Sequence, residues 1–125
     1  MTYKLGTRSL QNLSGVHPDL VAVVKRAIQI TEVDFSVLEG VRNINRQREL
    51  LKAGKSKTLN SRHLTGHAVD IAPWPIDWND LKRFEQVSEA MKAAAEELDV
   101  DVEWGGDWRT FYDGPHYQLS RKRYP

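Results

Sequence analysis

The sequence predicts an α+β fold in which helices pack on a small, mainly antiparallel sheet. Two long segments carry apolar residues at three- and four-residue steps, which is typical of helices that cover a core. Short apolar segments that end at glycine or proline predict strands before, between and after these helices. With 125 residues and 40% hydrophobic content, the chain fits one domain, residues 1–125, with one modest core.

The first half predicts a helix, a strand and a shorter helix. Residues 18–31 begin with Pro-Asp, which suits a first helical turn, and carry an apolar stripe along one face. Residues 35–38 are apolar and aromatic and predict a strand that ends in a turn at Gly40. Residues 45–53 predict a short charged helix closed by Gly54, and the polar residues 55–62 predict a loop.

The second half predicts a strand, the most regular helix of the chain and two closing strands. Residues 68–72 form an apolar strand pattern that Pro73 stops. The helix that follows carries its apolar stripe from residue 81 to 98, and Asp77 is expected to cap its first turn. Residues 100–104 and 116–119 predict strands on either side of a loop rich in glycine and tryptophan.

Composition limits the chemistry that the chain can perform. The 18 Lys and Arg nearly balance the 17 Asp and Glu, so overall charge indicates neither nucleic acid nor another particular partner. The chain has no cysteine, which excludes disulfides, thiolate zinc sites and a cysteine nucleophile, so a metal would need His and carboxylate ligands. The sequence shows no apolar leader and no apolar span, so we expect synthesis in the cytoplasm and no stable membrane association.

Residues 61–70 hold two histidines and an acid around the start of the 68–72 strand. Because side chains alternate along a strand, Asp70 should share a face with small residues, whereas His67 should share the face of the aliphatic residues. His63 precedes the strand in a loop that can fold over the Asp70 face. A zincin-like pairing of His63 with His67 would need a helix, which Gly66 opposes. We therefore expect His63 and Asp70 to form the ligand pair.

A second cluster lies in the segment from Trp104 to Tyr117. It contains Asp113 and His116, separated by a Gly-Pro turn, after a Trp-Gly-Gly-Asp-Trp run. Two histidines and one carboxylate leave a coordination position of zinc open for water, and zinc lowers the pKa of that water to about 7. Asp113 can accept the proton of that water. Asp107 is an alternative base, but an aspartate at this position could equally well bind backbone amides in a turn, and we favour the turn.

Both clusters resemble the signatures of the zinc peptidase family of D-Ala-D-Ala carboxypeptidases and L-alanyl-D-glutamate peptidases. The first signature, Ser-x-His-x-x-Gly-x-Ala-x-Asp, is filled at every position between Ser61 and Asp70. The second, a Trp-Gly-Gly-Asp-Trp-like loop before Asp-x-x-His, is filled by residues 104–108, Asp113 and His116. The resemblance implies a hedgehog/D-Ala-D-Ala peptidase-like fold.

The same resemblance implies the role of each site residue. It places one zinc ion on His63, Asp70 and His116 and general-base catalysis on Asp113. It also implies that Arg42 contacts the substrate carbonyl or carboxylate and that Ser61 positions substrate. Independently of the resemblance, Trp104 and Trp108 are expected in the core or the cleft wall, and Trp104 is a candidate for contact with substrate.

One position departs from the family pattern. Tyr117-Gln118 follows the last histidine where many relatives have Phe-Glu. We expect Gln118 to point away from His116, so that the difference affects the substrate more than the metal.

The resemblance also suggests what the protein does. It is closest to phage endolysins, so we expect a monomeric peptidoglycan hydrolase that cuts the L-Ala–D-Glu bond of the stem peptide and lyses the host once the membrane opens. The alternatives are a D-Ala-D-Ala carboxypeptidase and a zinc-bound wall-binding domain without catalysis. A metal-dependent nuclease would be indicated only by the His and Asp content and the basic tail at residues 121–123.

Overall fold

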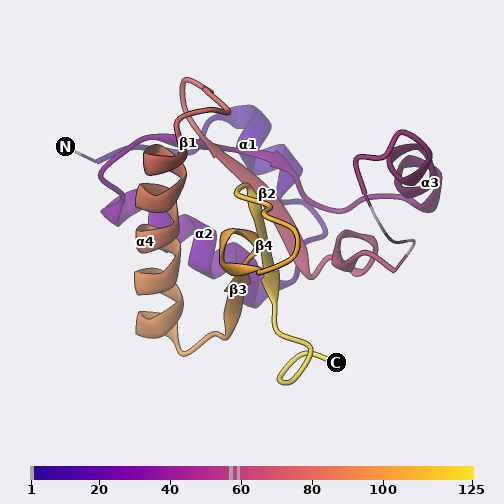
Figure 1. The fold of residues 1–125 in the computed structure, drawn as a ribbon. Coiled ribbons are helices and arrows are strands. Elements are labelled where there is room, and N and C mark those ends of the chain that lie inside the picture. Colours follow the sequence, from indigo (N-terminus) through magenta and orange to yellow (C-terminus); the bar gives the residue numbers. More distant parts are fainter. Residues whose placement is uncertain (1, 57, 59) are drawn as a thin grey trace.

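The computed structural model describes residues 2–56, 58 and 60–125 (Figure 1). The helices are α1 (Thr7–Asn12), α2 (Pro18–Ile30), α3 (Ile44–Lys52) and α4 (Leu81–Leu98). The strands are β1 (Phe35–Glu39), β2 (Ala68–Pro73), β3 (Val102–Trp104) and β4 (His116–Leu119). Two short 3-10 helices, η1 (Arg62–Thr65) and η2 (Gly105–Asp107), lie next to the strands that carry the two signature motifs.

The four strands form one antiparallel sheet in the order β1-β2-β4-β3. Helices α2 and α4 pack against each other beside this sheet, and α1 packs on β1 (Figure 1). Helix α3 stands at the side of the molecule, away from the α2 and α4 pair. The predicted α+β class and the antiparallel sheet with packed helices are confirmed.

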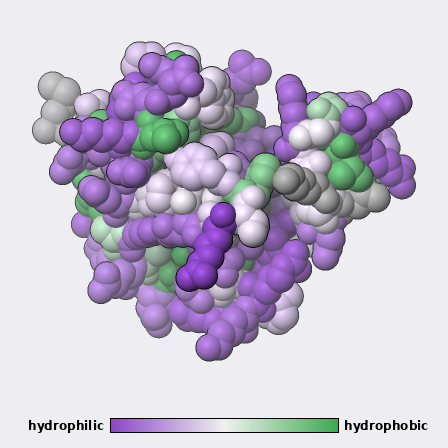
Figure 2. Space-filling model, viewed as in Figure 1, coloured by the Kyte–Doolittle hydropathy of each residue, from purple (hydrophilic) through white to green (hydrophobic). Residues whose placement is uncertain are grey.

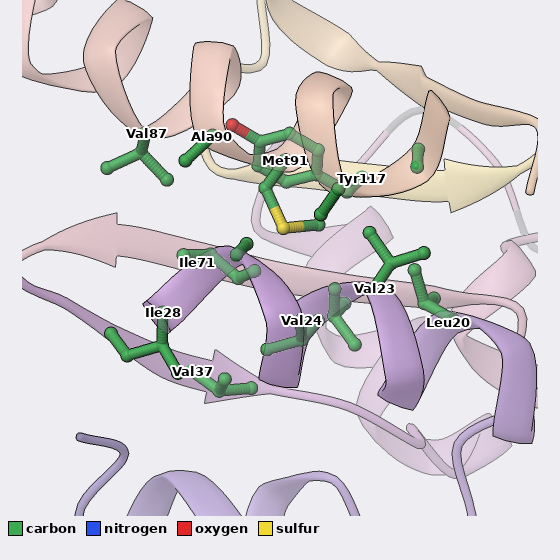
Figure 3. Close-up of a cluster of buried hydrophobic side chains, with 14 of the residues drawn as sticks. Leu20, Val23, Val24, Ile28, Val37, Ile71, Val87, Ala90, Met91 and Tyr117 are labelled. Carbon is green, nitrogen blue, oxygen red and sulfur yellow. The ribbon is translucent and has the colours of Figure 1, made fainter. Parts of the chain in front are cut away.

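The core forms where α2 and α4 meet the central strands (Figure 3). Helix α2 buries residues at steps of three, one, three and one, which is one helical face: Leu20, Val23, Val24, Ala27 and Ile28. The strands supply Val69, Ile71, Tyr117 and Leu119 at alternate positions. The intervening side chains of β2 and β4, among them those of Asp70 and His116, therefore face away from this core.

Helix α1 was not predicted, because its sequence has no apolar period. Ser9 is its buried residue, and the Ser9 hydroxyl accepts a hydrogen bond from the Val37 amide at 3.0 Å. The Asn12 side chain donates to the Val37 carbonyl at 2.8 Å. Polar contacts with β1 thus hold a helix that hydrophobic patterning cannot detect.

The predicted cap of α4 was wrong by one turn. The Asp80 carboxylate, rather than Asp77, accepts a hydrogen bond from the Arg83 amide at 3.4 Å. Asp77 lies four residues before Leu81 and accepts from the Asn79 amide in the preceding turn. An N-cap must directly precede the first helical residue, because only there does its side chain reach the free amides.

The predicted 55–62 loop leads into η1, and its residues 57 and 59 lie outside the described part of the chain. Among the helices described, none combines the length and the apolar character needed to cross a membrane.

Candidate metal centre

Two neighbouring strands and the turn before them bring the predicted ligands together. Asp70 on β2 and His116 on β4 are directly paired in the antiparallel register, so both side chains stand on the same face. His63 lies in η1, which ends at Gly66 in the left-handed conformation, with φ of 76°. A Cβ on Gly66 would come within 2.7 Å of the Gly15 carbonyl oxygen, so this turn requires glycine.

The three side chains offer a compact set of donor atoms. One ligand atom from each of His63, Asp70 and His116 lies within 4.8 Å of the others. Asp70 Oδ1 is 3.1 Å from His63 Nε2 and 3.4 Å from His116 Nδ1. Both histidines are buried, and their rings meet edge to face with centroids 5.1 Å apart. We call His63, Asp70 and His116 the ligand group, and their arrangement could hold one metal ion.

The hydrogen bond on the far side of the His63 ring fixes its tautomer. His63 Nδ1 lies 2.8 Å from the Gly40 carbonyl oxygen. A carbonyl oxygen only accepts hydrogen bonds, so Nδ1 must carry the proton. The lone pair of a neutral His63 therefore sits on Nε2 and faces Asp70, as a metal ligand requires.

The protonation of the group is strongly perturbed. Burial alone would raise the pKa of the Asp70 carboxyl, but its interactions with the rings of His116 and His63 hold it well below its usual range. Burial alone would lower the pKa of His116, yet the hydrogen bond that the protonated ring can donate to Asp70, together with the Asp70 charge, raises it. Asp70 is thus held ionised as a ligand requires, and proton binding by His116 competes with metal binding.

Asp113 lies beside this group on the loop that precedes β4. The amide of Asp113 donates to the Gly105 carbonyl at 3.0 Å, and its carbonyl accepts from the His116 amide at 3.1 Å. A Cβ on Gly105 would come within 2.4 Å of the Asp113 carbonyl oxygen, which shows how closely the two segments pack. Burial, together with the charge of Asp70, raises the pKa of Asp113. The site therefore holds two carboxyl groups with pKa values displaced in opposite directions.

Arg42 is buried and bound on several sides. Its guanidinium donates to both oxygens of Glu39, at 2.8 and 2.9 Å, and to Gln47 at 2.7 Å. It also lies 3.4 Å from Asp70 Oδ2, the oxygen on the other side of the carboxylate from the histidines. Arg42 thus binds the Asp70 oxygen that faces away from the histidines, and it also lines the adjacent cleft.

The remaining predicted residues divide between the cleft and the core. Ser61 lines the cleft, and its hydroxyl accepts from the His63 amide at 3.2 Å. Trp104 is buried against Tyr117, and its indole N–H donates to the Gly114 carbonyl at 2.7 Å. The tryptophan in the cleft wall is Trp108, whose ring lies 5.2 Å from that of His116. The geometry does not favour the predicted substrate contact of Trp104.

His67 and Asp107 lie apart from the ligand group. The His67 ring packs 5.5 Å from that of His17, and its Nδ1 lies 2.7 Å from the Thr65 hydroxyl. The prediction that His67 shares the face of the aliphatic core residues was wrong, because β2 begins only at Ala68. Asp107 forms an ion pair with Lys92 at 2.7 Å, in the η2 turn.

The ligand group opens into a cleft of about 440 Å³. One wall comes from α3 and the segment after it, through Leu50, Lys55 and Ser56. The other wall comes from the loop before β4, through Trp108 and Phe111. In Figure 2 the lobe that carries α3 stands out at one side of a mostly hydrophilic face. The shape is suited to an extended polar chain laid across the metal group.

Comparison with known proteins places this geometry in a family. A family model described as phage L-alanyl-D-glutamate peptidase matches residues 1–120. The chain belongs to this family. The resemblance expected from the sequence is therefore confirmed, and so is the expectation that the protein is a peptidase.

Individual relatives of the L-alanyl-D-glutamate peptidase family are similar over most of the chain. The L-alanyl-D-glutamate peptidase of Escherichia phage T5 is 34% identical, over 95% of this chain and 99% of its own length. The peptidoglycan L-alanyl-D-glutamate endopeptidase CwlK of Bacillus subtilis is 28% identical, over 85% of this chain and 74% of its own length. The crystal structure of the Serratia marcescens L-Ala D-Glu endopeptidase ChiX matches with a TM-score of 0.91 and 48% identity. That match covers 98% of this chain and 94% of ChiX.

Proposed function

We propose that this chain is a zinc-dependent peptidoglycan hydrolase that cuts the L-Ala–D-Glu bond of the stem peptide. The observation that carries the proposal is the convergence of His63, Asp70 and His116 at the floor of a cleft that also contains Asp113. The family to which the chain belongs supports the choice of bond.

The donor set fits one zinc ion. Two imidazoles and one carboxylate are the ligands of catalytic rather than structural zinc sites, because they leave a coordination position open. His63 presents the lone pair of Nε2 to the group, and Asp70 is held ionised by its neighbours. When bound, zinc lowers the pKa of water and polarises the scissile carbonyl.

Asp113 supports the proposal as general base. It lines the cleft, is half-buried and stands beside the ligand group without belonging to it. Its raised pKa brings the carboxyl closer to the pH at which it can both take and return a proton. In this mechanism Asp113 takes a proton from the attacking water and passes it to the amine of the departing D-glutamyl residue.

Arg42 and Ser61 support the same reaction by positioning. Arg42 holds Asp70 Oδ2 while Glu39 and Gln47 fix its guanidinium. Arg42 also lines the cleft, where an arginine can bind a substrate carbonyl or carboxylate. Ser61 holds the His63 backbone and places its own hydroxyl at the cleft wall.

The charge of the cleft agrees with an anionic peptide. Among the described lining residues, Lys and Arg outnumber Asp and Glu, with Lys55, Arg62 and Arg121 added to Arg42. A bound zinc ion would increase this positive charge. A D-glutamyl residue after the scissile bond has two carboxyl groups, and only one of them is joined to the next residue of the stem peptide. The substrate therefore carries a carboxylate close to the bond that is cut, which a positive cleft favours.

The setting of the reaction is also part of the proposal. The substrate lies outside the membrane, so we infer that the protein acts on the wall after the membrane has been opened. We also propose that it acts as a monomer. A D-Ala-D-Ala carboxypeptidase would share the metal group and Asp113 but would remove only the terminal residue of the stem.

Digestion of purified peptidoglycan followed by mass spectrometry of the soluble products tests the proposal. We expect stem peptides with a new D-glutamyl amino terminus and glycan that retains L-Ala. Release of D-Ala alone would identify a carboxypeptidase instead. Binding to the wall without any soluble product would identify a non-catalytic wall-binding domain, and the Asp113→Asn variant provides the inactive control.

A further inference from the structure

A line of polar side chains crosses the sheet from its edge to the ligand group. Glu103 on β3 is paired with Gln118 on β4, and His116, two residues earlier on β4, is paired with Asp70 on β2. Residues two apart on a strand share a face, so Gln118 stands beside His116. The prediction that Gln118 points away from His116 was therefore wrong.

Three short distances join these side chains. Gln118 Oε1 lies 2.8 Å from His116 Nε2, and Gln118 Nε2 donates to Glu103 Oε1 at 3.0 Å. His116 Nδ1, on the other side of the ring, lies 3.4 Å from Asp70 Oδ1. Glu103 is exposed, Gln118 is half-buried and His116 is buried.

The donor and acceptor chemistry of this line permits one arrangement. The Glu103 carboxylate only accepts hydrogen bonds, so the amide group of Gln118 that faces it must be the NH2. The other end of that amide is then its oxygen, which also only accepts. His116 Nε2 must consequently carry the proton, and a neutral His116 keeps its lone pair on Nδ1, facing Asp70.

Without Glu103 the amide of Gln118 has no fixed direction. A turned amide would donate its NH2 to His116 Nε2, which would move the ring proton to Nδ1. The proton would then point at Asp70 and block the nitrogen that a metal ion needs. His63 does not have this weakness, because a backbone carbonyl that cannot be turned fixes its tautomer.

We propose that Glu103 is a positioning residue that, through the amide of Gln118, holds His116 in the tautomer that binds metal. The proposal rests on the metal-ligand role of His116, but not on which peptide bond is cut. It assigns a function to an exposed residue at the outer strand of the sheet, outside the two signature motifs. Outer partners of this kind typically change metal affinity about 10- to 100-fold.

The first test reads the tautomer directly. In metal-free protein, at a pH high enough for the His116 ring to be neutral, the 15N shifts of His116 should report a proton on Nε2. The Glu103→Gln variant should show a mixture of both tautomers, because a glutamine side chain at this position can either accept from or donate to Gln118. An unchanged Nε2–H tautomer in this variant would overturn the proposal.

The second test is a double-mutant cycle on zinc affinity, measured by competition with a coloured chelator. Glu103→Gln should weaken zinc binding about 10-fold when residue 118 is glutamine. In the Gln118→Glu background it should have no weakening effect, because a carboxylate at 118 accepts from His116 Nε2 without help. An equal loss in both backgrounds would show a general effect of the removed charge and contradict the proposal.

A matched control and the unmodified protein complete the design. Glu96→Gln removes the same charge from the exposed surface of α4 and should leave both readouts unchanged. If the unmodified protein failed to bind zinc, the proposed function itself would be wrong. If it bound zinc and Glu103→Gln altered neither tautomer nor affinity, only the role of Glu103 would be refuted.

Discussion

Two carboxyl groups in one small site differ in protonation because their neighbours differ. Asp70 lies between two imidazoles and beside a guanidinium, and its interactions with the histidines outweigh the effect of its burial on its pKa. Asp113 is displaced the other way by burial and by the charge of Asp70. Opposite displacement of two nearby acids is a common basis for dividing ligand or nucleophile and base roles between them.

Replacing the proposed base should separate metal binding from hydrolysis. Asp113→Asn keeps the side-chain shape but cannot accept a proton, so we expect peptidoglycan hydrolysis to fall at least ~100-fold. Zinc content, measured by atomic absorption, should remain at one ion. Asp107→Asn is the matched control, since Asp107 pairs with Lys92 outside the cleft, and it should retain activity. If Asp107→Asn lost hydrolysis and Asp113→Asn retained it, Asp107 would be the general base instead.

His67 should make the protein less stable in mild acid. Burial lowers the pKa of His67, and the charges of Arg62 and His17 lower it further. A lowered folded-state pKa gives stability that is present above the unfolded value and is lost as the pH falls through the folded value. Urea unfolding between about pH 8 and about pH 5 should therefore show a smaller loss for His67→Gln than for the unmodified protein. If the two proteins lost the same free energy of unfolding between these pH values, His67 would not be the cause of the acid sensitivity.

At the scale of elements, the turn into β2 sets the position of His63. Gly66 and Gly54 both have positive φ, of 76° and 75°, but only Gly66 is pressed against another segment, at Gly15. Alanine at either position costs about 1–2 kcal/mol for the left-handed backbone conformation. Gly66→Ala should cost more and should also weaken zinc binding, whereas Gly54→Ala should leave zinc binding unchanged. Chemical denaturation and chelator competition measure the two effects, and equal results for both variants would refute the special role of the Gly66 turn.

The start of α4 provides a second comparison between elements. Asp80→Ala removes the side chain that accepts from the Arg83 amide and should destabilise the protein by about 1 kcal/mol. Asp77→Ala removes a contact in the preceding turn, so we expect a smaller loss in thermal unfolding. A larger loss for Asp77→Ala would support the original sequence-based cap.

The sequence predicts elements well where burial is periodic. Helix α4 and strand β2 were predicted because a repeating apolar face and proline stops are properties of the local sequence. Helix α1 could not be predicted, since the Ser9 and Asn12 contacts that hold it come from β1, about 25 residues away. The Asp80 cap was missed because two aspartates close together offer the same local signal.

At the scale of the whole molecule, the site draws on segments far apart in the chain. Strand alternation predicted that Asp70 faces away from the core, and the signature spacing indicated His63 and His116, which the structure brings together with Asp70. Alternation did not apply to His67, which lies before the start of β2. The same alternation rule, applied to positions 116 and 118, would have placed Gln118 beside His116. The link from Gln118 to Glu103 could not be predicted, because it depends on the register of β3 against β4.

Zinc titration of metal-free protein, with peptidoglycan hydrolysis as the signal, tests the central claim most directly. Chelator-treated protein should be inactive and should unfold at a lower temperature, because zinc binds the folded site and stabilises it. Hydrolysis should return in proportion to added zinc and reach its plateau at one equivalent, with His116→Ala remaining inactive throughout. Full hydrolysis by protein shown to be free of metal, or a plateau at two equivalents, would contradict a single catalytic zinc ion on His63, Asp70 and His116.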